Sequence, residues 1–270
     1  MTALLLVLFL SLAGLGVWLY RKHGARARLM SSPLSDAQRS IIRACVPLYS
    51  RLPAPLKDRL EGKINLFLGQ VDFQGCNGLE VTEEMRLSIA AQACLMIVAK
   101  DIWYENLRTI LIYPGAFKSR MIAHDGPVVS EQEVVRIGES WSRGPVVLSW
   151  PHAADGAHID DDGHNVVLHE FAHQLDDLSG YTDGAPILAH DHSEGEWARV
   201  IGGGYWRLAD QVDAGRETFL DPYGATAPEE YFAVIVEYFF ERPIDLQREE
   251  LEVYAQLAKF FALDPAKWGS

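Results

Sequence analysis

The run Asn165-Val-Val-Leu-His-Glu-Phe-Ala-His-Gln-Leu-Asp176 contains His169, Glu170 and His173 as an H-E-x-x-H motif. Two His residues four positions apart lie about 40° apart around an α-helix, so both imidazoles can bind one metal ion. Glu170 then lies beside the open position of the metal, where a carboxylate can accept a proton from water. The motif predicts a zinc-dependent peptidase that holds a single Zn²⁺ per chain.

The residues around the motif predict an amphipathic helix. Asn165 is a good N-cap before this helix, and Ser179-Gly180 supply a stop after it. The apolar positions share one side of the helix, namely Leu168, Phe171, Ala172 and Leu175. The alternative interpretation is a surface helix that carries two solvated His side chains.

A catalytic zinc site usually has three protein ligands and one water, so a third ligand is expected downstream. A third His six residues after His173 is excluded because position 179 is Ser. Asp176 lies on the same face of the helix, but its short side chain suits a partner of a ligand His better than a ligand. The remaining candidate is a carboxylate on a second helix.

That second helix is predicted from Thr226 to Glu241. Thr226 and Glu229 have the spacing of a capping box, which occupies Glu229 locally. Glu230 points about 100° away from Glu229 and is free to reach the metal. Glu237 lies on nearly the same face as Glu230 and is a candidate for holding a ligand His. For both acids the alternative is a solvated charge on a helix surface.

Two segments of the chain resemble a known family. They are Gly163-His-Asn-Val-Val-Leu-His-Glu-Phe-Ala-His-Gln-Leu-Asp-Asp177 and Tyr223-Gly-Ala-Thr-Ala-Pro-Glu-Glu-Tyr-Phe-Ala233. Both look like segments of the Mlc titration factor A family of zinc-dependent peptidases and, more distantly, of the anthrax lethal factor catalytic domain. The resemblance extends in weaker form from about Leu107 through the C-terminal region.

The resemblance implies an α+β, zincin-like (gluzincin) metallopeptidase domain. Carried over residue by residue, it implies His169, His173 and Glu230 as metal ligands and Glu170 as general base. It also implies that Tyr223 lies near the reacting carbonyl, where its hydroxyl can stabilise an oxyanion. The substrate is then a peptide or protein. The name of the family suggests an alternative function, a regulatory binding protein that sequesters a transcriptional regulator or another protein with little catalysis.

Peptide substrates commonly bind as an added strand at a sheet edge. The β-rich run Gly144-Pro-Val-Val-Leu-Ser-Trp150 precedes the motif helix and is a candidate for that edge strand. An ordinary buried strand is the alternative interpretation. A helix at 82–100 and strands at 109–113 and 128–137 are also predicted. Strands followed by helices favour an α+β core.

Several His and acidic residues surround the motif in sequence. The loop from Asp155 to Asp162 is rich in acids, and His152, His158 and His164 lie close to it. Their irregular spacing favours a solvated loop over a second cation site. None of them is assigned as a ligand.

Residues 1–20 carry no charge and are long enough to cross a bilayer as one helix. Basic residues follow at once and favour a cytoplasmic location for the rest of the chain, namely Arg21, Lys22, Arg26 and Arg28. The sequence thus predicts a single-pass protein of the bacterial inner membrane with a cytoplasmic catalytic portion. The alternative is a secreted protein, cleaved near Ala25-Arg-Ala27. Cys45, Cys76 and Cys94 are widely spaced and read as buried free thiols, which agrees with the cytoplasm.

The predicted organisation has four parts along the chain. They are a transmembrane anchor at 1–20, a basic juxtamembrane linker at 21–33, a mainly helical portion at 34–108 and a zincin-like catalytic portion at 109–270. The formal net charge of −13 makes nucleic acid a poor partner. The expected partners are therefore a peptide or protein substrate, the membrane and, under the alternative function, a protein regulator.

Overall fold

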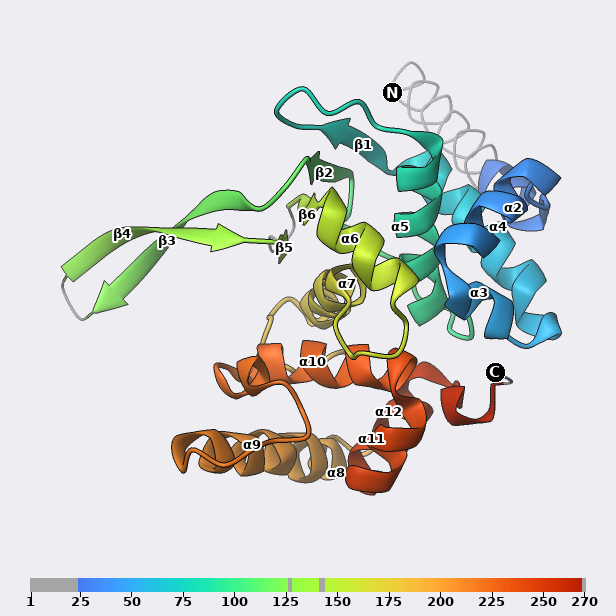
Figure 1. The fold of residues 1–270 in the computed structure, drawn as a ribbon. Coiled ribbons are helices and arrows are strands. Elements are labelled where there is room, and N and C mark those ends of the chain that lie inside the picture. Colours follow the sequence, from blue (N-terminus) through green and yellow to red (C-terminus); the bar gives the residue numbers. More distant parts are fainter. Residues whose placement is uncertain (1–23, 126–127, 141–143, 269–270) are drawn as a thin grey trace, which may run out of the picture.

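The computed structural model describes residues 24–125, 128–140 and 144–268. Helices form most of the molecule, and a small sheet lies beside them (Figure 1). The fold is therefore α+β, as the sequence predicts.

The central sheet has four strands in the order β1-β2-β6-β5. These strands are β1 (Asp72–Gly75), β2 (Thr109–Tyr113), β6 (Val146–Ser149) and β5 (Gly138–Ser140). β1, β2 and β6 run parallel to one another, and β5 pairs antiparallel with β6. The predicted strand at 109–113 is confirmed as β2.

The predicted edge strand is internal. β6 lies between β2 and β5, and all four of its residues are buried. A continuous apolar run such as Val146-Val-Leu148 is typical of a strand covered on both faces, which explains the error. The edge on this side of the sheet is β5, whose three residues are too few to show a strand pattern in the sequence.

A separate hairpin projects from the body of the molecule (Figure 1). It consists of β3 (Phe117–Asp125) and β4 (Val128–Arg136), which pair antiparallel along their whole length. The strand predicted at 128–137 is confirmed as β4, but it belongs to this hairpin and not to the central sheet.

The N-terminal half supplies a layer of helices. Its members are α2 (Asp36–Cys45), α3 (Pro47–Arg51), α4 (Ala54–Gln70) and α5 (Glu83–Met96). Thr82 caps α5 by accepting a hydrogen bond from the Met85 amide, which fixes the start predicted from the sequence. α5 packs against α2 and α4 on one side and against α7 on the other.

The C-terminal half supplies the remaining helices. They are α6 (Trp150–His158), α7 (Val166–Asp176), η1 (Asp177–Ser179), α8 (Glu194–Trp197), the π-helix η2 (Ala198–Gly202), α9 (Gly203–Asp213), η3 (Pro222–Ala225), α10 (Pro228–Glu241), α11 (Pro243–Glu249), α12 (Leu251–Phe261) and η4 (Pro265–Lys267). α7 contacts α5, α6, β5 and β6 as well as α10. It is thus the central helix of the fold, between the sheet and the C-terminal helices (Figure 1).

One cluster of buried side chains joins the two halves of the chain. It runs from Leu34 to Leu263, and the rings of Phe67 and Tyr104 pack on Phe171 of α7 at centroid distances of 5.9 and 5.0 Å. Aromatic contacts of this kind bury large apolar areas in fixed relative orientations. The N-terminal helices therefore hold the inner face of α7 in place.

No helix among the described residues is long and apolar enough to cross a membrane. The predicted anchor at 1–20 lies outside the described residues. Within the predicted juxtamembrane linker, residues 24–31 are helical. This helix approaches α4 so closely that a Cβ on Gly62 would lie 2.1 Å from the carbonyl oxygen of Met30. The end of the linker is therefore part of the folded body.

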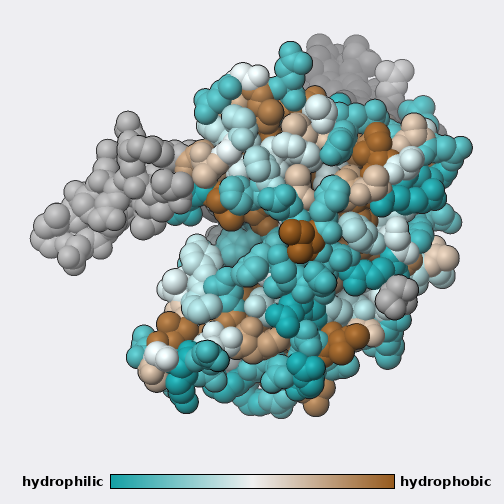
Figure 2. Space-filling view, viewed as in Figure 1, coloured by the Kyte–Doolittle hydropathy of each residue, from teal (hydrophilic) through white to brown (hydrophobic). Residues whose placement is uncertain are grey.

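The face of the molecule seen in Figure 2 is mainly hydrophilic, with hydrophobic residues scattered over it. This agrees with the acidic composition, because like charges keep the surface solvated.

Candidate metal centre

α7 presents the two His residues of the motif from a well-defined helix. The side chain of Asn165 accepts hydrogen bonds from the amides of Val167 and Leu168, at 3.1 and 3.0 Å. After η1 the chain leaves the helix at Gly180, which adopts a left-handed conformation with φ of 96°. The predicted cap and the predicted stop are both confirmed.

α10 supplies Glu230 from its first turn. The predicted capping box of Thr226 and Glu229 is wrong. The helix begins at Pro228 after the N-cap residue Ala227, and the Thr226 hydroxyl donates instead to the carbonyl oxygen of Tyr223 at 2.7 Å. Thr226 therefore closes the turn before the helix and leaves its start uncapped by a side chain.

Three predicted ligands meet between α7 and α10. One ligand atom each from His169, His173 and Glu230 lies within 4.8 Å of the others. Oε2 of Glu230 is 2.9 Å from Nε2 of His169 and 3.5 Å from Nε2 of His173. A tetrahedral zinc site places its ligand atoms roughly 3.3 Å apart. The donor set and its spacing therefore fit a zinc ion.

Glu237 orients the first of these ligands. Its Oε1 lies 2.8 Å from Nδ1 of His169, which leaves Nε2 directed at the other two ligands. Burial would lower the pKa of His169, but the negative charges of Glu237 and Glu230 raise it well above the usual value. The two His rings in turn hold the pKa of Glu230 far below its usual range, although burial opposes this. The predicted role of Glu237 as a partner of a ligand His is confirmed in its geometry.

His173 differs from His169 in its second nitrogen. Nδ1 of His173 is buried and has no hydrogen-bond partner among the described residues, and the same is true of Oδ1 of Asp176. The other oxygen of Asp176 accepts from the amide of Gly184 at 2.6 Å. The expected hydrogen bond between Asp176 and a ligand His is therefore not formed. Asp176 ties the loop after α7 to the helix end instead.

Glu170 is buried beside the ligand cluster. Burial raises the pKa of its carboxyl to about 7, although the nearby His169 and His173 favour the charged form. A carboxyl with a pKa near neutrality can both accept and release a proton. The geometry and the pKa of Glu170 therefore suit a general base.

β5 closes over Glu170. A Cβ on Gly138 would lie 2.4 Å from Oε1 of Glu170, so only Gly allows the strand to approach so closely. Gln174 of α7 donates to the hydroxyl of Ser140 at 2.6 Å and fixes the other end of β5. The positive charge of Arg136, just before β5, also lowers the pKa of Glu170. Sequence reasoning missed these residues because each acts through a tertiary contact.

Tyr223 lies on η3 at the side of the ligand cluster. Its ring centroid is 5.9 Å from that of His169, and 49% of its surface is exposed. Burial of the hydroxyl and the negative charge of Glu230 raise the pKa of Tyr223 to about 12. The hydroxyl therefore keeps its proton at neutral pH and can donate a hydrogen bond.

The acidic loop before α7 does not form a second cluster of metal ligands. Among the described residues, His169, His173 and Glu230 are the group of His, Cys, Asp and Glu close enough to share a metal ion. Asp160 pairs with Arg51 of α3, and His164 lies 3.5 Å from Asp221. The three Cys residues are free thiols, as predicted, but only Cys45 and Cys94 are buried, whereas Cys76 is partly exposed. The loop therefore connects elements and holds no assigned ligand.

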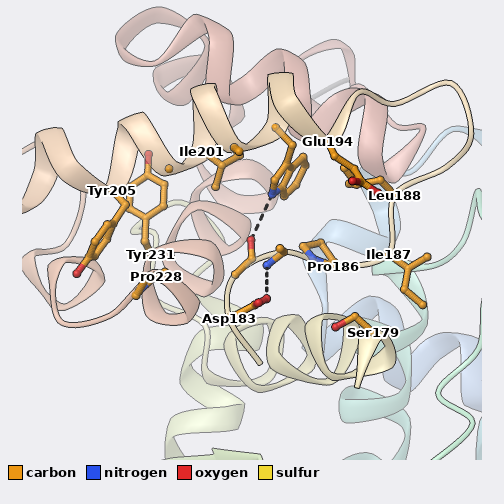
Figure 3. A pocket seen from close by; sticks show the side chains of 15 residues that line it. Ser179, Asp183, Pro186, Ile187, Leu188, Glu194, Ile201, Tyr205, Pro228 and Tyr231 are labelled. Carbon is orange, nitrogen blue, oxygen red and sulfur yellow. Dashed lines mark hydrogen bonds between the residues drawn. The ribbon is translucent and has the colours of Figure 1, made fainter. Parts of the chain in front are cut away.

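A cavity of about 650 Å³ lies on the other side of the first turn of α10 (Figure 3). Its walls come from the loop after η1, from α8, η2 and α9, and from Pro228 and Tyr231. None of the five predicted site residues lines it. The cavity is therefore separate from the ligand cluster.

An α+β fold in which one helix carries H-E-x-x-H and a second helix brings a Glu to the same point defines a metallopeptidase-like protein. Within this class, the chain belongs to the family described as glucose-regulated metallo-peptidase M90, which it matches over residues 20–262. The family resemblance found in the sequence is thereby confirmed.

Similar proteins occur in several bacteria. An uncharacterized protein from Synechocystis sp. is 42% identical over 241 residues, which cover 88% of each chain. Proteins named Mlc titration factor A are 32% identical to this chain in both Klebsiella pneumoniae and Yersinia pestis. The matched regions cover 82% of this chain in both cases and 84% and 82%, respectively, of those proteins.

Proposed function

We propose that this chain is a zinc-dependent peptidase that hydrolyses peptide bonds with Glu170 as general base. The observation that carries this proposal is the convergence of His169, His173 and Glu230, with the buried carboxyl of Glu170 beside them. A non-catalytic site would not require a titratable carboxyl with a pKa near 7 beside the ligands.

His169, His173 and Glu230 would hold the ion, and Glu237 fixes the ring of His169. When bound, Zn²⁺ supplies Lewis acidity that polarises the scissile carbonyl and lowers the pKa of a water molecule. The carboxylate of Glu170 would then accept the proton of the attacking water and pass it to the leaving amine. Burial raises the pKa of this group, which makes the carboxylate a stronger base than an exposed one.

Two further elements support substrate binding and turnover. The Tyr223 hydroxyl keeps its proton at neutral pH and can donate to the oxyanion that forms at the attacked carbonyl. Among the described residues β5 is the edge strand beside Glu170, and an extended peptide could pair with its outer side. In this role β5 replaces the strand at 144–150 that the sequence suggested.

The full-length protein tests the proposal directly. Wild type and Glu170→Gln are compared for zinc content and for cleavage of a broad peptide library. We expect both proteins to hold zinc, and we expect the substitution to lower cleavage by about 10²-fold to 10⁴-fold because it removes the base. Equal cleavage by the two proteins would contradict the role of Glu170. Zinc in both with no cleavage by wild type would contradict the peptidase function.

A second candidate function follows from the names of the relatives. Proteins named Mlc titration factor A align with most of this chain, and that name suggests a regulatory role. In this alternative, the chain binds a protein regulator and cleaves little. The peptide-library experiment separates the two functions, because a chain that only binds a regulator would hold zinc and cleave no peptide, with or without Glu170→Gln.

We also propose that residues 1–20 anchor the protein in the bacterial inner membrane with the metal centre in the cytoplasm. The charge-free run and the basic residues after it support this arrangement. Carbonate extraction of membranes, followed by protease treatment of spheroplasts, tests it. Release by carbonate would contradict the anchor, and digestion of the folded portion from outside would contradict the orientation.

A further inference from the structure

Asn165, the N-cap of α7, makes more hydrogen bonds than a cap requires. Its side-chain oxygen caps the helix, as described above, but its amide nitrogen also lies within hydrogen-bond distance of three acceptors, which share its two protons. These are the carbonyl oxygen of Gly156 at 2.7 Å, Oε1 of Gln92 at 2.8 Å and Oε1 of Glu241 at 2.9 Å. Only 1% of the Asn165 surface is exposed. An ordinary cap needs the oxygen alone, so the amide donors serve another purpose.

Glu241, at the end of α10, completes this network. Its Oε2 accepts from the backbone amide of Gly163 at 3.1 Å, while its Oε1 accepts from the side chain of Asn165. Glu241 is 3% exposed, so both of its oxygens are satisfied inside the protein. It therefore holds two residues of the loop that leads into α7.

The acids of α10 form a stripe along the face that contacts α7. Glu230, Glu237 and Glu241 are seven and four residues apart, which places them on one side of a helix. Glu230 reaches the Nε2 atoms of the two His residues, and Glu237 reaches Nδ1 of His169. Glu241 reaches Asn165, one helical turn before His169.

Asn165 connects the last two acids of this stripe. Oε2 of Glu237 accepts from the backbone amide of Asn165, while Oε1 of the same carboxylate contacts His169. The backbone amide of Asn165 can point at Glu237 only if the residue itself is fixed, and its side-chain amide and Glu241 provide that constraint. A continuous path of hydrogen bonds therefore runs from Glu241 through Asn165 and Glu237 to His169.

We propose that Asn165 and Glu241 are positioning residues, which hold Glu237 and through it the ring of His169 in the orientation that zinc binding needs. This inference rests on the proposed zinc site. Partners outside the ligands commonly tune the affinity of a metal site in this way. A purely structural network would stabilise the loop before α7 without affecting the metal.

The first test measures zinc affinity of the full-length protein by competition with a chromogenic chelator. Asn165→Ser keeps an oxygen that can cap α7 but removes the amide donors. We expect zinc affinity to fall by about threefold to tenfold. Thr82→Ala is the matched control, because it removes the cap of a different helix, α5, where the Thr82 side chain bonds the Met85 amide and not a residue of the site. The control should lower the melting temperature and leave zinc affinity unchanged, and an equal loss of affinity in both variants would overturn the proposal.

The second test asks whether Asn165 acts through Glu237. We expect Glu237→Gln to weaken zinc binding by about 10-fold to 100-fold, and we expect the double variant with Asn165→Ser to be no weaker than Glu237→Gln alone. Glu241→Gln, which conserves side-chain volume, repeats the test if Asn165→Ser does not fold. Additive losses of affinity in both cycles would overturn the proposed path.

A third measurement does not depend on zinc or on hydrolysis. In the metal-free full-length protein, the proton on Nδ1 of His169 is followed by NMR in wild type and in the Asn165→Ser variant. We expect its resonance to shift or to exchange faster in the variant, because Glu237 is released. An unchanged resonance would overturn the proposal. Zinc binding without hydrolysis would contradict the proposed peptidase function and leave these three tests intact.

Discussion

Buried carboxylates occur in two regions of this molecule, and their surroundings differ. Glu61 of α4 accepts two hydrogen bonds from the Arg39 guanidinium, one from the Tyr49 hydroxyl and one from the Leu34 amide. Burial alone would raise the pKa of Glu61, but these donors hold it below its usual value. This carboxylate is neutralised by an arginine of its own domain, as expected for a structural ion pair.

Glu170 and Glu241, which lie near α7, lack such complete compensation. Burial raises the pKa of Glu170 to about 7 and that of Glu241 to about 9. Glu230 and Glu237 share the ring of His169 between them. The comparison teaches that the N-terminal layer balances the charge of its buried acid with an arginine, whereas Glu230 and Glu237 converge on one His ring, where a divalent cation would balance their charge.

We expect the largest loss of zinc affinity from Glu230→Gln. Removal of a charged ligand should weaken zinc binding by at least about 100-fold, since even partners outside the ligand shell contribute 10-fold to 100-fold. We expect the metal-free variant to be less stable than wild type, because the depressed pKa of Glu230 indicates that the two His rings stabilise its charge in the fold. Zinc competition and urea unfolding in excess chelator measure the two quantities. Glu229→Gln, one residue away, is the matched control and should retain zinc.

Glu61→Gln should affect the stability of the protein alone. It breaks a buried, charge-assisted cluster, so we expect the free energy of unfolding to fall by about 2 kcal/mol. Zinc affinity should not change, because the cluster lies in the N-terminal layer. Urea unfolding and zinc competition on one preparation measure both. A loss of zinc without a loss of stability would show that the two regions are not independent.

Gly138→Ala tests the close contact between β5 and Glu170 in the metal region. A Cβ there would lie 2.4 Å from Oε1 of Glu170 and should displace that carboxylate. We expect kcat for peptide cleavage to fall about tenfold while zinc content is retained, because proton transfer depends on position. Gly115→Ala is the control, since no atom lies within 4 Å of its added Cβ. Equal kcat values in the two variants would argue against the contact.

The pH dependence of stability should differ in sign between the two regions. The pKa of Glu61 is depressed in the folded state, so its stabilising contribution is present above the unfolded pKa of about 4.3 and is lost as pH falls. The pKa of Glu241 is raised to about 9, so its ionisation destabilises the fold increasingly as pH rises from about 4.3 toward that value.

Urea midpoints in excess chelator from about pH 2.5 to about pH 9 test this difference, because the contribution of Glu61 is lost only below its unfolded pKa of about 4.3. We expect Glu61→Gln to approach wild type at the acidic end of the range. Glu241→Gln should gain stability relative to wild type toward the alkaline end. Parallel curves for the two variants would contradict the distinction between compensated and uncompensated carboxylates.

Much of the site could be predicted from the sequence because it lies on two helices with clear patterns. The cap at Asn165, the stop at Gly180 and the spacing of His169 and His173 are all local signals. Glu230 and Glu237 could be assigned because helical periodicity fixes which acids share a face. Local sequence signals were therefore sufficient to predict the side chains through which the two helices contact each other.

Contacts between distant segments could not be predicted in this way. β5 has three residues, too few to show a strand pattern, so the sequence offers only the longer run of β6 as a candidate edge strand, and β6 is instead the buried strand of the alternative interpretation. The roles of Gly138 and Glu241 depend on what packs against them and leave no local pattern. The capping box failed because the helix begins later than predicted, with Ala227 as its N-cap, and the Thr226 hydroxyl donates to the carbonyl oxygen of Tyr223.

The most direct test of the account is X-ray absorption at the zinc edge of the full-length protein, combined with zinc stoichiometry. We predict about one zinc per chain with two imidazole ligands and only nitrogen or oxygen in its first coordination sphere. Glu230→Gln should lose this signal. Sulfur ligation, or a wild-type protein that binds no zinc, would contradict the assignment of His169, His173 and Glu230.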